Sequence, residues 1–163
     1  MHILIKNKFL NYGDYKVKCS IGKRGINSFK REGDLTTPRG NFKIKGLFYR
    51  KDRIKKLKTK LKKTVIKKNM GWCDEPISNK YNKMVHLPFS RSYEKLYRKD
   101  NMYDLILPLD YNMKPVRRYK GSAIFIHVAK KKFSPTKGCI ALRKNDLIKL
   151  LKLIKKTSIV KII

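Results

Sequence analysis

Two short apolar runs on either side of a basic loop constrain the fold of this chain more than any other feature. Residues 123–128 form the first run, which carries His127 near its end, and residues 138–142 form the second, which opens with Gly138-Cys139. Short apolar runs bounded by turn residues are typical of buried strands. The 12 positions from His127 to Cys139 are enough for a loop that folds back. We therefore expect two neighbouring segments that place the imidazole beside the thiol.

A cysteine and a histidine held together in this way can carry nucleophilic catalysis. A thiol nucleophile needs a base that removes its proton and backbone N–H groups that receive the developing oxyanion. Here His127 would be the base and Cys139 the nucleophile, and Gly138, which has no Cβ, lets the backbone approach a substrate closely. The alternative is structural, since a free cysteine is among the most buried residue types and often only packs.

The composition describes one folded domain, residues 1–163, with a strongly basic surface. Hydrophobic residues make up 41% of the chain, and 43 Lys and Arg against 11 Asp and Glu give a formal charge of +32. This charge favours polyanions such as nucleic acid, anionic lipid or acidic wall polymer. Because most of the basic residues are lysines spread along the whole chain, and lysine is poorly suited to bidentate recognition, we expect a solvated basic surface and no specific nucleic-acid partner.

The number of cysteines and the N-terminal residues further limit the class of protein and its expected compartment. Three cysteines without short spacing and three histidines argue against a disulfide framework and against a zinc site, so we expect no metal and no cofactor. The N-terminal residues 1–6 indicate a strand and lack the apolar core of about 7 to 15 residues that marks a signal peptide. As written, the chain is expected to be cytoplasmic, or periplasmic if it is a trimmed or otherwise exported form. Its oligomeric state is not defined by the sequence.

Several other segments in the first half of the chain predict local structure or a role near the site. Residues 15–21 alternate as a half-buried strand with Cys19 inside. The loop that begins at residue 30 is either an ordinary connection or lies near the site, with Arg31 or Arg39 facing an acidic group. The basic segment 50–69 is either an amphipathic surface helix that touches anionic polymer or membrane, or a loop, which its like charges favour slightly. Trp72 and Cys73 are expected to pack, and His86 is either a second polar group of the site or structural.

The second half is expected to alternate strands and short helices. We expect a helix over residues 92–97 with Ser92 as its N-cap, and a strand over 102–111 in which Pro108 marks an edge or a bulge. A helix over 146–156 would follow Asn145 and bury one apolar face, and residues 158–163 would close the chain as a strand. The chain is therefore expected to be mostly β with a few small helices.

Four stretches resemble the YkuD-type L,D-transpeptidase catalytic domain. Ile126-His127 followed by Thr136-Lys137-Gly138-Cys139 is similar to the family's histidine and its Ser/Thr-His-Gly-Cys motif. Thr37-Pro38-Arg39-Gly40-Asn41-Phe42 resembles the family's Thr-Pro-x-Gly-x-Phe element. Gly71-Trp72-Cys73-Asp74-Glu75-Pro76 and Tyr103-Asp104-Leu105 are similar to a subgroup common in alphaproteobacteria. The resemblance covers nearly the whole chain.

The resemblance implies a β-sandwich-like catalytic domain and a cysteine acyl-enzyme reaction on peptidoglycan stem peptides. Cys139 would attack the carbonyl of the third stem residue and release the terminal D-Ala, with His127 as base and then acid. Backbone N–H groups at Gly138 and Cys139 would hold the oxyanion, and Thr136 would shape that turn. Carbapenems are expected to acylate Cys139. Nearby lysines, Lys137 among them, are expected to favour the thiolate.

The chain departs from the family pattern at three positions, which leaves alternatives open. Lys137 stands where the family has histidine, Val128 where it has glycine, and Ala141 where it has an arginine that helps to hold substrate, with Arg143 two residues later. Candidate substrate-binding residues are therefore Arg143, Lys137, Arg39 and His86. The main alternative is an L,D-carboxypeptidase of peptidoglycan recycling, in which water resolves the thioester, and the second is a basic polyanion-binding protein with an inactive site.

Overall fold

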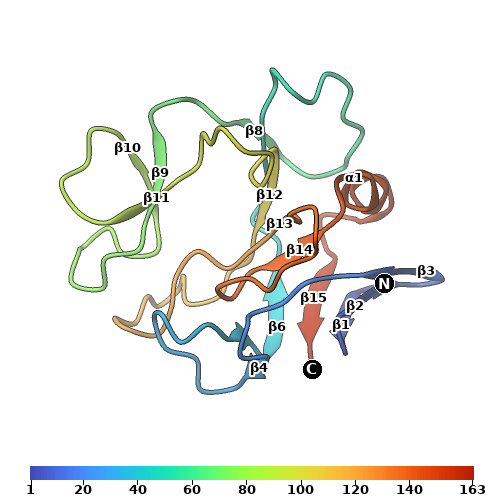
Figure 1. The fold of residues 1–163 in the computed structure, drawn as a ribbon, viewed down its shortest axis with the longest axis horizontal. Coiled ribbons are helices and arrows are strands. Elements are labelled where there is room, and N and C mark those ends of the chain that lie inside the picture. Colours follow the sequence, from blue (N-terminus) through green and yellow to red (C-terminus); the bar gives the residue numbers. More distant parts are fainter.

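Two five-stranded sheets form the frame of the molecule (Figure 1). The computed structural model describes all of residues 1–163. The first sheet has the order β3-β2-β1-β15-β6, with the bounds Tyr15–Lys18, Phe9–Tyr12, Ile3–Lys6, Ile159–Ile162 and Gly40–Lys43. The second has the order β14-β13-β12-β7-β8, with the bounds Ile140–Leu142, Phe125–Val128, Leu105–Pro108, Leu47–Tyr49 and Lys63–Val65. This arrangement confirms the mostly-β, sandwich-like fold expected from the resemblance.

Smaller elements complete the structure around these sheets. A three-stranded sheet has the order β10-β9-β11, with the bounds Met84–His86, Met70–Cys73 and Tyr93–Lys95. The short strands β4 (Ile26–Asn27) and β5 (Thr37–Pro38) pair in parallel, and the one helix, α1, spans Lys144–Leu153. No helix has the length and the apolar composition needed to cross a lipid bilayer.

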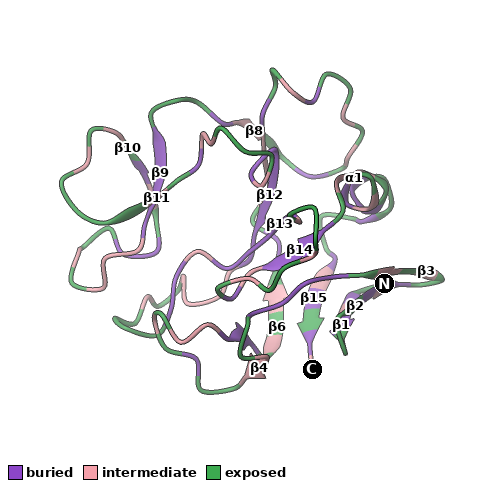
Figure 2. Cartoon of the chain, viewed as in Figure 1, coloured by how far each residue is buried: buried purple, intermediate pink, exposed green.

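The second five-stranded sheet is buried on both faces, as Figure 2 shows for β12, β13 and β14. Side chains alternate along a strand, so Ile126 and Val128 point into the larger core with the first sheet and α1. Phe125 points the other way, into a smaller core built with Trp72 of the three-stranded sheet. Residues 123–128 read as a continuous apolar run because both faces of their strand are covered.

The basic segment 50–69 contains no helix. Its chain runs as a loop to β8 and buries Ile54 and Leu61 against the larger core. Arg53 fastens the loop by donating hydrogen bonds to the carbonyls of Lys99 and Asp100 and to the buried carboxylate of Asp104. Of the two alternatives for this segment, the structure therefore adopts the loop, which charge repulsion favoured slightly, and does not form the surface helix.

Three local expectations also need correction. Residues 93–95 form β11, not a helix, because they pair with β9, and Ser92 donates to Asp74 instead of capping. The helix begins two residues earlier than expected, after Arg143, although its apolar face, Leu147, Leu150, Leu151 and Ile154, is buried as predicted. Pro108 lies at the end of a central strand and not at an edge, and β7 pairs only with the first half of that strand.

Candidate active site

The two chemically important side chains come from adjacent parallel strands of the second sheet. His127 lies on β13, where it is in register with Ala141 of β14, and Cys139 immediately precedes β14. His127 and Phe125 share one face of β13. The Phe125 N–H donates to the Cys139 sulfur at 3.4 Å, and the Cys139 thiol donates to the Ala123 carbonyl at 3.1 Å. The thiol and the imidazole consequently face the same side of the sheet.

Both side chains line one cleft with a volume of about 550 Å³. Its walls include Thr136, Lys137 and Gly138 from the loop before Cys139, and Lys30 and Glu32 from the N-terminal half of the chain. The sequence analysis therefore named the centre of this cleft, and the structure brings His127 and Cys139 together there. No hydrogen bond joins them directly, because the thiol is turned toward Ala123.

The imidazole is positioned as a neutral base. His127 Nδ1 lies 2.9 Å from the Val128 carbonyl, so the tautomer that satisfies this contact carries its proton on Nδ1 and leaves the Nε2 lone pair free. The ring of Tyr103 packs edge-on against it, with centroids 5.5 Å apart. Burial lowers the pKa of His127 to about 4, and the charges of Arg98 and Lys130 act in the same direction. At neutral pH the imidazole is uncharged.

The thiol is neutral as well, in contrast to the expectation from the neighbouring lysines. Burial raises the pKa of Cys139 to about 12, and the hydrogen bond from Phe125 and the charge of Lys30 offset this only in part. Counting lysines along the sequence was misleading because desolvation of a buried thiolate outweighs the attraction of exposed cations. The resting site therefore contains a thiol and an imidazole, and the proton must move when the sulfur attacks.

The turn before Cys139 is held by threonines on both sides. Gly138 has φ +147°, and a Cβ at this position would lie 2.8 Å from the Thr36 carbonyl oxygen. Thr37 Oγ1 donates to the Gly138 carbonyl at 2.8 Å and accepts from the Gly22 N–H at the same distance. The Gly138 N–H donates to Thr136 Oγ1 at 3.1 Å. The Cys139 N–H has no acceptor within the chain and is the free donor at the nucleophile.

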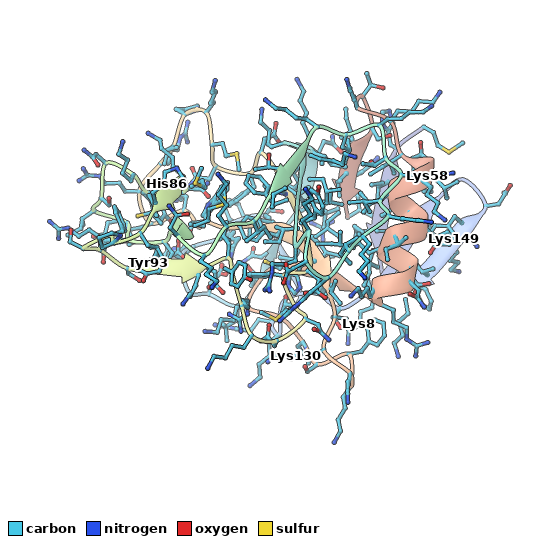
Figure 3. The ribbon with its side chains drawn as sticks, turned by 90° about the horizontal axis from the view of Figure 1, so that it is seen from above. Lys8, Lys58, His86, Tyr93, Lys130 and Lys149 are labelled. Carbon is cyan, nitrogen blue, oxygen red and sulfur yellow. The ribbon has the colours of Figure 1, made fainter.

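Of the four residues suggested for substrate binding, the structure places only Lys137 in the cleft. Arg39 is exposed on the loop between β5 and β6, where its N–H donates to the Asn27 carbonyl. Arg143 precedes α1 and lies over the ring of Phe133 at 5.3 Å. His86 is exposed on β10, at the end of the molecule away from Lys130, a residue of the cleft wall (Figure 3).

Sequence reasoning missed other residues of the cleft wall. Tyr103, which contacts His127, donates to Glu94 Oε1 at 3.1 Å, and Glu94 is paired with Arg98 at 3.5 Å. Lys30 and Glu32 also line the cleft. Glu94 was assigned to a helix, so its position could not be inferred, and no local pattern places Lys30 and Glu32 beside Cys139.

No group of three or more His, Cys, Asp or Glu side chains is arranged to hold a metal ion. The titratable groups around the cysteine are dispersed along the wall of the cleft. The chemistry that the site supports with its own residues is acyl transfer through a thiol, with a neutral imidazole as the proton carrier.

The structure combines a mostly-β frame with a cysteine and a histidine that line one cleft. The family model of the YkuD L,D-transpeptidase catalytic domain matches residues 5–162, and the chain belongs to this family. The family's function is L,D-transpeptidation of peptidoglycan. Neither a curated protein nor a solved structure is significantly similar to the chain. The match confirms the resemblance at the level of the family, and the subgroup stays a prediction.

Proposed function

We propose that this chain is an L,D-transpeptidase that forms a thioester between Cys139 and a peptidoglycan stem tetrapeptide. The observation that carries the proposal is the shared position of Cys139 and His127 on one face of adjacent strands, at the base of a cleft large enough for a peptide. Membership of the family supplies the substrate class. Both residues of the pair belong to the region that the family model matches.

The first half-reaction transfers the acyl group to sulfur. The thiol turns from the Ala123 carbonyl toward His127 Nε2, which takes the proton as Sγ attacks the carbonyl carbon of the third stem residue. The oxyanion that forms accepts a hydrogen bond from the Cys139 N–H. The C–N bond to the terminal D-Ala then breaks, and the imidazolium gives its proton to the leaving nitrogen.

The second half-reaction releases the enzyme. An amine from a neighbouring stem attacks the thioester carbon, its proton passes to His127, and the C–S bond breaks. Sγ then recovers the proton and the neutral pair is restored. Water attacks the same thioester by the same route, so an L,D-carboxypeptidase differs from a transpeptidase only in which acceptor reaches the cleft first.

Intact-mass spectrometry tests the proposal. Mixed with a stem tetrapeptide ending in D-Ala, the protein should gain the mass of the tripeptide acyl group, and a carbapenem should add its own mass. Cys139→Ala should abolish both adducts, whereas Cys19→Ala, which alters a thiol buried in the larger core, should retain them. Turnover or adducts that persist in Cys139→Ala would contradict the assignment. Product analysis with and without an acceptor stem separates transpeptidation from hydrolysis.

A further inference from the structure

Two of the charged side chains in the cleft lie close to the turn that carries Cys139. Lys30 and Glu32 come from one loop and both line the cleft. A turn at Glu32, in which the Asp34 N–H donates to the Arg31 carbonyl, brings both side chains to the cleft. They present a cation and an anion to the same wall, next to the nucleophile.

Lys30 belongs to an ion pair whose positive end faces the cleft. The side chain is only 5% exposed, and its Nζ donates to Asp34 Oδ1 at 2.7 Å. Asp34 does not line the cleft, and its carboxylate also accepts hydrogen bonds from the Arg31 N–H and from the N–H and hydroxyl of Thr36. Although burial acts in the opposite direction, these partners lower the pKa of Asp34 to about 2. The negative charge is therefore satisfied inside its own loop.

The ammonium of Lys30 retains donor capacity toward the cleft. Of its three hydrogens, one is used by Asp34 and one by the Arg31 carbonyl at 3.4 Å. The third has no acceptor in the protein. A carboxylate entering the cleft would meet a buried cation that is already fixed in place, which is the condition under which a charge-assisted hydrogen bond is strong.

Glu32 offers the opposite charge without a cationic partner. Its Oε2 accepts hydrogen bonds from the hydroxyls of Tyr81 and Ser122, and it forms no salt bridge with any Lys or Arg. Its Oε1 accepts no hydrogen bond from the protein. Two neutral hydroxyls hold the carboxylate in place, and the free oxygen is suited to a cationic group of a ligand.

Both charges adjoin Cys139. A Cβ on Gly138, the residue before the nucleophile, would lie 3.3 Å from Lys30 Nζ. Ser122, which donates to Glu32 at 2.8 Å, is followed by Ala123, whose carbonyl accepts the Cys139 thiol. A ligand group bound between Lys30 and Glu32 would therefore be a few bonds from the reacting carbonyl.

We propose that Lys30 and Glu32 form a subsite for the α-amino acid that leaves or enters at the acyl group, with its carboxylate on Lys30 and its amino group on Glu32. The inference rests on the proposed acyl transfer through Cys139. It makes a free α-carboxylate on the departing residue a requirement of the enzyme, and it makes free α-amino acids competent acceptors.

The proton balance fits this arrangement. When the C–N bond breaks, His127 gives its proton to the leaving nitrogen, and the amine takes a further proton from water to become the ammonium that Glu32 binds. The amino acid then leaves as a zwitterion. In the reverse direction an amino acid loses that proton to solvent and its neutral amine attacks the thioester carbon. A second proton passes from the amine through His127 to Sγ as the C–S bond breaks.

The first test uses the unaltered protein with two tetrapeptides, one ending in D-alanine and the other in D-alaninamide. The thioester on Cys139 is followed by quenched mass spectrometry. We expect the free acid to acylate about 10- to 100-fold faster, the effect of one hydrogen bond to a charged group. Equal rates would overturn the subsite and leave the thioester mechanism intact. Absence of a thioester from both peptides would overturn the mechanism as well.

The second test asks whether Lys30 causes the preference for the free acid and whether Glu32 supports the exchange of amino acids. Lys30→Met should reduce the preference for the free acid to about twofold or less, because the loss of the charged donor removes that hydrogen bond. Lys152→Met, a change on the exposed surface of α1, is the matched control and should keep it. Glu32→Gln, folded by circular dichroism, should slow exchange of isotopically labelled D-alanine into the tetrapeptide by about tenfold. An unaltered preference in Lys30→Met, or unaltered exchange in Glu32→Gln, would overturn the assignment.

Discussion

The pH dependence of acylation follows from the buried histidine. His127 has its pKa lowered from 6.5 to about 4, chiefly because burial penalises the imidazolium. Its basic form is therefore complete at pH 5.5, where an ordinary histidine would be about one-tenth neutral. We predict that the rate of thioester formation is nearly constant from pH 7.5 to pH 5 and falls only as the pH approaches 4.

The lowered pKa of His127 also makes the free energy of unfolding depend on pH. The unfolded chain binds more protons than the folded one between pH 6.5 and pH 4, so the contribution is present above 6.5 and is lost as the pH falls toward 4. The difference between the two pKa values corresponds to roughly 3 kcal/mol. His127→Gln should remove this component, and urea unfolding of both proteins at pH 7 and pH 4.5 measures it.

The decisive assay is rapid-quench mass spectrometry of the Cys139 adduct across this pH range, with a carbapenem that does not itself titrate there. A rate that falls about tenfold between pH 7 and pH 5.5 would show that the imidazole titrates normally, and it would refute the reasoning from burial. The stability measurement is an independent check, because it does not require that the protein acylate anything.

Three further predictions concern the surroundings of the site. Gly138→Ala would place a Cβ 2.8 Å from the Thr36 carbonyl oxygen, at a residue with φ +147°. The rate of acylation in the mass assay should therefore fall by at least about 100-fold. Retention of the wild-type rate would show that the turn is not constrained. Thr37→Val removes the hydroxyl that joins the Gly22 N–H to the Gly138 carbonyl. The free energy of unfolding in urea should fall by about 1 to 3 kcal/mol, and acylation should become slower. An unchanged free energy of unfolding would mean that water replaces the hydroxyl. Asp104→Asn removes a fully buried carboxylate paired with Arg53 and Lys144 and should cost about 1 to 3 kcal/mol in urea unfolding. The exposed Asp52→Asn is the control and should cost much less, because solvent screens its ion pair with Arg50. Equal losses would contradict the role of burial.

The residues around the nucleophile were predictable because their signal is local. The apolar runs that became β13 and β14, and the spacing of Leu147, Leu150 and Leu151 on α1, follow directly from periodicity. The strand at residues 93–95 was missed because its conformation is imposed by pairing with β9, about twenty residues away. Such pairing overrides the local cap signal at Ser92.

The residues that support the turn before Cys139 could not be predicted either, because they lie far from that turn in the sequence. The contact of Thr37 with Gly138 joins residues 101 positions apart, and that of Glu32 with Ser122 joins residues 90 positions apart. The protonation state of Cys139 was misjudged because charge can be counted along a sequence whereas burial cannot. Both errors concern tertiary packing and leave the identity of Cys139 and His127 unaffected.

The position of β15 has a consequence for the biosynthesis of the enzyme. This strand fills the space between β1 and β6 in the first sheet, parallel to one and antiparallel to the other. The N-terminal hairpins therefore have no partner on that side until residue 162 has emerged from the ribosome. A nascent chain that already contains Cys139 would consequently still lack this interior strand of its first sheet until translation has passed residue 162.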